Sequence, residues 1–328
     1  MLSLILRRLV HCTILFLSSV VLTYALASTA LDPRAYFEGR QPPPPSRVVD
    51  DELARLGMDD RAPLPERFAH WADRAVVHGD LGMTIDGESV NAEFGRRVGV
   101  SVRLLLVGTV AGTAIGVLAG VWAAVRRGGL GDRALTVFSF AVLCVPTFVL
   151  ALLLKTGALA VNRAAGSTVI LYTGEHTPAL QGDWVAQLRD TAAHLLLPAI
   201  CVAIPAIASY SRYQRAATLD VLGADHLRTA QAKGLTPGRA LLRHGLRISL
   251  VPVSVFFSFG MLTLFTGAVF TEEIFGWPGM GSWLVDSVQK GDVNSVVAID
   301  LFAAAVVLLA GLLADVVHAL LDPRVRQP

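Results

Sequence analysis

The sequence predicts an all-α integral membrane protein with six transmembrane helices and both termini in the cytoplasm. Its composition supports this class, because 53% of its 328 residues are hydrophobic and only 16% are charged, whereas soluble domains carry roughly 25% charged residues. Six apolar stretches approach the length of about 20 residues that crosses a bilayer core. Lysine and arginine gather in alternate loops, as they do in proteins with several spans.

The predicted spans begin close to the N-terminus. Arg7 and Arg8 precede the first span, as they would precede a signal peptide. Its apolar run of about 20 residues exceeds the roughly 7–15 of a signal peptide, which favours a retained span. The predicted spans are Leu9–Leu31, Val102–Val125, Ala134–Leu154, Thr191–Tyr210, Ile248–Phe270 and Val296–Leu320.

The placement of charges sets the predicted orientation. One set of short loops and chain ends holds 14 basic and four acidic residues, while the opposite short loops hold four basic and seven acidic residues. Because Lys and Arg accumulate on the cytoplasmic side, the first set is predicted to be cytoplasmic. Its basic residues are Arg7, Arg8, Arg126, Arg127, Arg133, Arg212, Arg215, Arg228, Lys233, Arg239, Arg243, Arg247, Arg324 and Arg326.

This orientation divides the chain into three parts. Residues 1–31 form the cytoplasmic N-terminus and the first span, residues 32–101 form an enlarged extracytoplasmic loop, and residues 102–328 form a five-helix core. The core contains a cytoplasmic loop at residues 211–247.

Two amphipathic helices are predicted in the extracytoplasmic loop. Asp50 is expected to cap the first, on which Leu53 and Leu56 share a face. Pro65 suits the first turn of the second, whose apolar stripe includes Trp71. A tryptophan on such a stripe suits a helix lying at the membrane surface. A docking surface for an external partner, a lid over a pore mouth and a passive cap all remain open.

The second predicted span carries a glycine at every fourth position, which places all of them on one helix face. Such a stripe lets the backbone of a neighbouring helix approach closely. Packing within the helix bundle is favoured over a substrate-facing role. The stripe consists of Gly108, Gly112, Gly116 and Gly120.

Motifs of catalysis and nucleotide binding are missing from the sequence. It contains no GxxxxGK[ST] phosphate loop, no HExxH and no GxSxG. Cys12, Cys144 and Cys201 lie in separate apolar runs, so neither a disulfide framework nor a metal site is indicated. This sparse chemistry predicts a conduit rather than an enzyme, with no metal or cofactor bound directly.

The loop at residues 211–247 is the most informative segment. Asp225 is expected to cap a short helix, Gly234 to end it in the left-handed conformation, and Pro237 to start a second helix. Two short helices joined by a glycine turn predict a rigid knob that docks into a groove of a partner. The alternative is a basic loop resting on anionic lipid headgroups. The first predicted helix carries Leu227, Ala230 and Lys233.

This loop resembles the coupling loop of bacterial ABC importer permeases, specifically the first permease of the dipeptide/oligopeptide family. Asp225–Leu235, Leu241–Arg247 and the pair Val251-Pro252 carry the resemblance. Three further motifs occur in the family's order, so the resemblance covers nearly the whole chain. They are Gly79-Asp80-Leu81-Gly82, the outer-side turn made of Gly276, Trp277, Pro278, Gly279, Met280 and Gly281, and the closing Leu321-Asp322-Pro323-Arg324-Val325-Arg326.

The resemblance implies a type I ABC importer permease fold in the bacterial inner membrane and a role in peptide uptake. It also implies a heterodimer with a second permease, two ATPase subunits or one fused ATPase, and an extracytoplasmic peptide-binding lipoprotein, with no nucleic-acid partner. ATP and magnesium are expected on the ATPases. The coupling residues that it implies are Asp225, Arg228, Thr229, Ala230, Lys233 and Gly234.

The chain departs from the family's general pattern within this loop. The pattern E-A-A-x3-G falls on Arg228, Thr229, Ala230 and Gly234, so its glutamate is absent. A contact that depends on that carboxylate is therefore not transferred to this chain.

Other functions are weighed against peptide import. A permease for nickel, glutathione or another small solute would share the same family. A secondary transporter independent of ATP would show inverted repeats or charges at the midplane, and neither is found. An intramembrane hydrolase would use Glu272, Glu273 or His318, but no spacing of nucleophile and base supports it.

Overall fold

The computed structural model describes residues 2–180 and 182–321, and within these it describes no side chains for residues 2–9, 255–267 and 318–321. Regular structure in the described ranges is helical, apart from one bridge between Met83 and Ser89. The predicted all-helical class is therefore confirmed. Of the closing motif, Asp322 to Arg326 lie outside the described residues.

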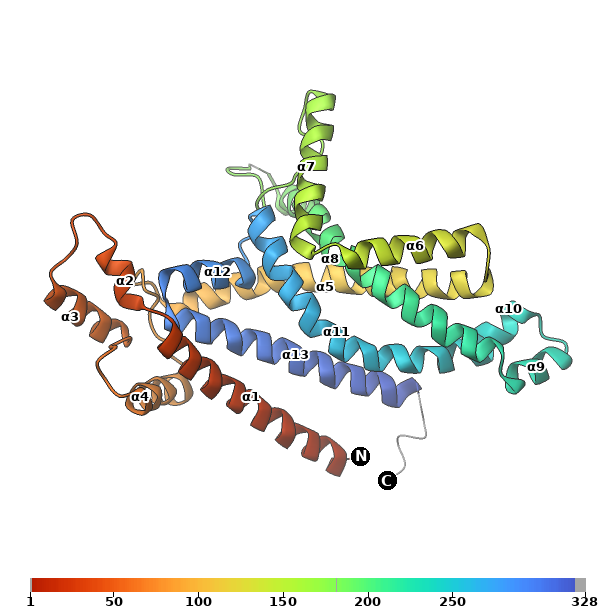
Figure 1. Cartoon of the computed structure of the whole chain (residues 1–328), viewed down its shortest axis with the longest axis horizontal. Helices are drawn as coiled ribbons and strands as arrows, with labels where there is room; N and C mark the ends of the chain where they lie inside the picture. The colour runs from red at the N-terminus through yellow and green to blue at the C-terminus, as the bar shows by residue number, and fades with distance from the viewer. Residues whose placement is uncertain (1, 181, 322–328) are drawn as a thin grey trace. The chain divides into compact units, whose positions relative to one another are not determined.

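Most of the helices follow one another with short connections, and the longest one joins α7 to α8 (Figure 1). They are α1 (Leu2–Ala30), α2 (Pro33–Glu38), α3 (Ser46–Leu56), α4 (Leu64–Val77), α5 (Val90–Val125), α6 (Leu130–Cys144), α7 (Thr147–Ala165), α8 (Trp184–Leu222), α9 (Asp225–Ala232), α10 (Pro237–Ala240), the π-helical turn η1 (Leu241–Gly245), α11 (Leu246–Phe275), α12 (Met280–Lys290) and α13 (Val293–Leu321).

The described chain forms two compact units. The first comprises the residues up to Val102 together with Pro278–Leu308, and the second comprises Arg103–Trp277 and the residues from Leu309 onward.

Five of the helices in the described ranges are long and apolar enough to cross a membrane. They are Val10–Ala30, Val90–Val125, Thr147–Ala165, Trp184–Leu222 and Val293–Val317. A further helix, α11, runs unbroken for 30 residues over the predicted fifth span. Its residues 255–267 lack described side chains.

The predicted third span, Ala134–Leu154, is wrong as a single helix. The chain leaves the helical conformation at Val145, whose ψ is 121°, and α7 begins after Pro146. Proline lacks the N–H that a helix interior needs, and it disfavours helical geometry in the residue before it. The apolar segment long enough to cross a membrane is therefore α7.

In the second unit, α5 and α8 approach closely through the glycine stripe. A Cβ atom added to Gly108, Gly112, Gly116 or Gly120 would lie 2.5–2.9 Å from an atom of α8. Real Cβ atoms essentially never come closer than 3.0 Å. The stretch of α8 that faces the stripe is buried, with Val202 and Ala206 each at 3% exposure. The stripe thus lies against protein, and α8 packs in turn against α6, α7 and α11.

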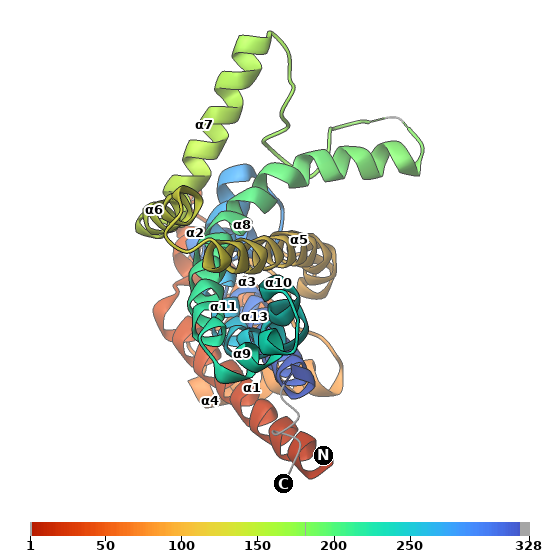
Figure 2. The ribbon, with the colours of Figure 1, turned by 90° about the vertical axis from the view of Figure 1, so that its right-hand side faces the viewer.

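Figure 2 shows that α8 bends along its length. Pro198 and Pro205 lie inside this helix, and an internal proline is a common cause of a sharp bend.

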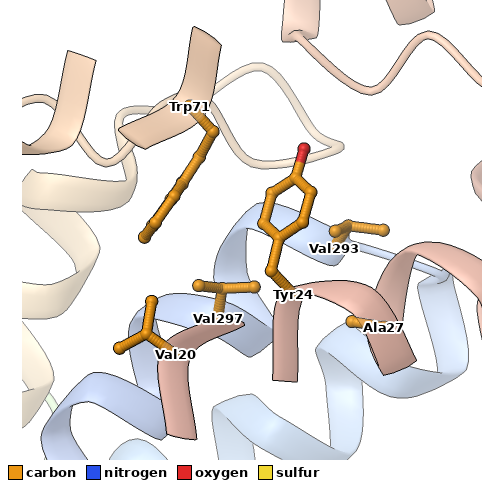
Figure 3. Close-up of a cluster of buried hydrophobic side chains, with 6 residues drawn as sticks. All are labelled: Val20, Tyr24, Ala27, Trp71, Val293 and Val297. Carbon is orange, nitrogen blue, oxygen red and sulfur yellow. The ribbon is translucent and has the colours of Figure 1, made fainter. Parts of the chain in front are cut away.

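In the first unit, the tryptophan on the apolar stripe of α4 packs against protein. Trp71 is 4% exposed and joins Val20 and Tyr24 of α1 and Val293 and Val297 of α13 (Figure 3). Tyr24 lies 5.5 Å from Trp71 between ring centroids. The predicted interfacial role of this tryptophan is therefore replaced by a place in a buried cluster.

The segment predicted to be extracytoplasmic has its own core, built on α2, α3 and the turn near Ile85. Leu53 and Leu56 are fully buried. Asp50 is not the helix cap that the sequence predicted, because α3 begins four residues earlier, at Ser46. Its carboxylate instead pairs with Arg34 at 2.9 Å and with Arg61 at 2.7 Å.

Buried polar groups tie this segment to the start of α13. Asp292, 2% exposed, accepts hydrogen bonds from the backbone N–H of Ile85 at 2.9 Å and from the hydroxyl of Ser295 at 2.7 Å. Asn294 donates to the carbonyls of Leu56 and Met83. Burial raises the pKa of Asp292 above its ordinary value. These bonds hold the segment firmly on α13.

The glycine stripe yields a prediction with a matched control. Gly112→Ala places a Cβ atom 2.8 Å from the Cβ of Ala206 and 2.9 Å from the carbonyl oxygen of Ala203, so we expect a loss of about 1–3 kcal/mol in stability. Gly157→Ala makes the same change in α7, where nothing lies within 4 Å, and should leave stability unchanged or slightly higher. Thermal unfolding of the detergent-solubilised variants tests this, and equal midpoints for the two would contradict it.

Candidate functional site

The segment between α8 and α11 forms a small folded knob. In Figure 2, α9 and α10 lie on the side that faces the viewer. Leu227, Ala240 and Leu241 are nearly or fully buried there and pack with Val221 from the end of α8. The knob therefore has a core of its own that fixes α9 relative to α8.

The turn after α9 depends on Gly234. Its φ of +94° lies in the left-handed region that favours glycine. The N–H of Gly234 donates to the carbonyl of Gln231 at 2.9 Å, and the N–H of Leu235 donates to that of Ala230 at 3.3 Å. The turn thus closes the end of α9 and directs the chain into Pro237, the first residue of α10.

Asp225 does not cap α9 as the sequence predicted. Ala224 is the cap residue, and Asp225 is the first residue of the helix, with a side chain 96% exposed. Asp225 lies 3.7 Å from Arg228, which is also largely exposed. An acidic residue in the first turn still favours the helix through its dipole.

The remaining implied coupling residues lie on α9 and its turn. Thr229 is exposed and donates to the carbonyl of Asp225 at 2.9 Å, Lys233 is exposed, and Ala230 is half-buried against the core of the knob. A pocket of about 220 Å³ lies beside these residues, and it is lined by His226, Thr229, Ala230, Lys233, Leu235 and His244.

The knob is strongly basic. Residues 225–245 contain four basic residues and one acidic residue, a net charge of +3 with the histidines neutral. A partner surface that receives the knob is best matched by acidic side chains.

Gly245 is a feature that the sequence reasoning missed. A Cβ atom there would lie 2.8 Å from Leu241, 3.0 Å from Val221 and 3.2 Å from Leu227. This glycine ends the π-helical turn η1, which leads directly into α11. A glycine beside a buried leucine offered no decisive signal in the sequence.

A second missed feature is the ion pair at the root of the knob. Asp132, at the start of α6, accepts from the guanidinium of Arg215 in α8 at 2.5 and 2.9 Å. Its side chain is 4% exposed, and it also accepts from the backbone N–H of Gly128. These bonds lower the pKa of Asp132 to about 2. In the sequence, both residues contributed only to the charges that predict the orientation of the chain.

A buried side-chain amide, one residue before Arg215 in α8, joins α8 to α11. Gln214, fully buried, donates to the hydroxyls of Thr218 at 3.0 Å and of Ser249 at 2.9 Å. Thus α6, α8 and α11 are linked by polar contacts where the knob begins.

The predicted outer-side turn lies at the opposite end of α11. Gly276 ends this helix with a φ of +62°, and the N–H of Trp277 donates to the carbonyl of Glu272 at 2.8 Å. Trp277 is fully buried, Pro278 follows it, and Gly279 precedes the first residue of α12. Gly281 lies buried in the first turn of α12. One continuous helix therefore joins this turn to the knob.

The residues weighed for hydrolysis do not form a catalytic group in the described part of the chain. Glu272 is 1% exposed, Glu273 is exposed, and the side chain of His318 lies outside the described residues. No cluster of metal-binding side chains occurs among the described residues.

Comparison with known proteins assigns a role to this architecture. The family model for the "binding-protein-dependent transport system inner membrane component" matches residues 116–327. The oligopeptide transport system permease protein OppB of Mycobacterium tuberculosis is 50% identical over 320 residues, which cover 98% of each chain.

Two further relatives match over almost their full length. The di/tripeptide transport system permease protein DppB of Pseudomonas aeruginosa is 34% identical over 337 residues. The dipeptide transport system permease protein DppB of Escherichia coli is 32% identical over 340 residues. In both cases the match covers 99% of each chain. All three relatives are transport components, which confirms the prediction that this chain is not an enzyme.

The buried ion pair at the knob root can be tested by a double-mutant cycle on Asp132→Asn and Arg215→Gln. We expect a coupling energy of about 1–3 kcal/mol in unfolding, because Asp132 is nearly buried. The exposed pair of Asp225 and Arg228, 3.7 Å apart, serves as the control and should couple weakly. Equal coupling in the two cycles would contradict a structural role for the buried pair.

Proposed function

Because this chain belongs to the family of inner membrane components of binding-protein-dependent transport systems, we propose that it is the permease subunit of an ATP-driven peptide importer. It is a multi-pass inner-membrane protein that forms half of a translocation pathway. Peptides are the proposed cargo because the three closely matching relatives are named for oligopeptide, di/tripeptide and dipeptide transport. Nickel and glutathione remain alternatives that a transport assay separates from peptides.

The observation that carries the proposal is the knob. It presents α9 on a rigid base, and the sequence contains no phosphate loop with which the chain could bind ATP. In the proposed mechanism, α9 seats in a cleft of a cytoplasmic ATPase, and closure of an ATPase pair on ATP moves the knob. Asp225, Arg228, Thr229, Lys233 and Gly234 form the docking face, and ATP and magnesium bind on the ATPases.

The route from the knob into the membrane follows from the contacts. A displacement of α9 is transmitted to α8 through the shared core around Leu227 and Val221. It passes to α6 through Asp132 and Arg215 and to α11 through Gln214. These helices move together as a body, since buried contacts of this kind transmit strain.

The complete importer needs further subunits. We place six spans in this chain, with α11 as the fifth, cytoplasmic termini and an enlarged extracytoplasmic loop at residues 32–101. A homologous second permease completes the pathway as a heterodimer, two ATPase subunits or one fused ATPase supply energy, and a peptide-binding lipoprotein delivers cargo from outside. The coupling loop lies within residues 211–247 of the core that spans 102–328.

Reconstitution tests the proposed function. The chain is placed in liposomes with its second permease, ATPases and binding lipoprotein, and peptide uptake is measured with ATP supplied on the ATPase side. We expect uptake that requires ATP, the peptide and every subunit. Uptake by this chain alone, indifferent to ATP, would instead identify a secondary transporter.

The turn at Gly234 gives a prediction about coupling. Gly234→Pro forces φ away from +94° and removes the N–H that donates to Gln231. We expect membrane insertion to persist and ATP-driven uptake to be lost. Gly238→Ala is the matched control, because nothing lies within 4 Å of its added Cβ and its φ is not positive. Wild-type uptake by Gly234→Pro would contradict a coupling role and would indicate that the loop only contacts lipid headgroups.

A further inference from the structure

The second unit contains a groove between α6 and α8 that lies apart from the proposed docking face on α9. We propose that this groove binds an anionic phospholipid, with its phosphate at Arg212 and the upper part of an acyl chain along Phe140 and Leu143. The groove has a volume of about 560 Å³ and is also lined by Thr136, Ser209, Tyr213, Ala216 and Arg215, whose guanidinium is paired with Asp132. This volume falls in the range of small-molecule sites, about 300–1,000 Å³.

Arg212 supplies the charge that selects the ligand. Its guanidinium carbon lies 4.1 Å from the centroid of the Phe140 ring, and among the described residues it forms no ion pair. The neighbouring Asp132 is already occupied by Arg215 and by the backbone N–H of Gly128. The guanidinium of Arg212 is therefore positioned by an aromatic ring and has no acidic partner among the described residues.

The position of Arg212 along α8 matches the level of lipid phosphates. No Asp, Glu, Lys or Arg occurs in the 21 residues between Asp190 and Arg212, and about 20 apolar residues cross the hydrocarbon core. The apolar run therefore ends at Arg212, at the boundary where basic residues meet anionic headgroups. On α6, no charged residue follows Arg133 before the helix ends at Cys144.

The walls of the groove favour a lipid over a peptide in transit. Phe140 is 51% exposed and Leu143 is 42% exposed, and on α6 the adjacent Val137 and Phe138 are 68% and 43% exposed. A water-filled path for peptides would not present so continuous an apolar face. A phospholipid combines a charged headgroup with apolar chains, which matches a groove that has a charged side chain beside an apolar wall. Because the charged side chain is the cationic Arg212, the headgroup must be anionic.

The test measures lipid retention directly on the purified chain, so that its outcome is independent of peptide transport. The chain is incorporated into nanodiscs of phosphatidylcholine containing phosphatidylglycerol, extracted gently, and examined by native mass spectrometry for retained phosphatidylglycerol. We expect one phosphatidylglycerol to be retained in preference to phosphatidylcholine. Arg212→Gln should weaken its binding about fivefold to tenfold, while Arg212→Lys should keep most of it.

Two controls make the result specific. Arg127→Gln removes an exposed arginine from the same side of the chain and should leave retention unchanged. Phe140→Ala removes the ring under Arg212 and should weaken retention, and thermal unfolding of each variant reports whether it folds. Equal retention by wild type and Arg212→Gln, or no preference for phosphatidylglycerol, would overturn the proposal. So would a cross-link from the variant Tyr213→Cys to the second permease, since that subunit would then cover the groove.

Discussion

The close approach of α5 to α8 is the constraint on which the second unit depends. Four glycines on one face of α5 leave that face without side chains, so that a Cβ atom added at any one of them would meet α8 at 2.5–2.9 Å. In a membrane, where burying apolar side chains gives little net driving force, such close backbone contact is a main source of helix association. It fixes α8, and α8 carries the base of the knob at its end.

From this anchored helix, three kinds of contact position the knob. The apolar core of Leu227, Ala240 and Leu241 sets α9 against the end of α8. The bidentate ion pair of Asp132 and Arg215 ties α8 to α6. Gly245 permits the tight packing from which α11 departs. Because α11 then runs unbroken to the turn at Gly276, one continuous helix joins the knob to that turn.

Local chemistry was predictable from the sequence, and long-range contacts were not. The glycine stripe, the start of α10 at Pro237 and the apolar helices follow from spacing and backbone preference. The break at Pro146 was missed because the apolar run continues through it. The length of that run was given more weight than the presence of a helix-breaking proline. Asp50 and Asp132 illustrate the second limit, because their partners Arg34, Arg61 and Arg215 are set by tertiary packing and leave no local mark.

In the proposed mechanism, α9 is the surface that binds an ATPase subunit. This binding is tested most directly by cross-linking in a cysteine-free background, with Cys12, Cys144 and Cys201 replaced and a single cysteine introduced at the exposed position Ala232. A short thiol reagent should join this cysteine to the ATPase subunits in membranes, whereas a cysteine at the exposed position Arg55 of α3 should not react with them. ATPases that bind the chain yet give no cross-link at position 232 would contradict the account.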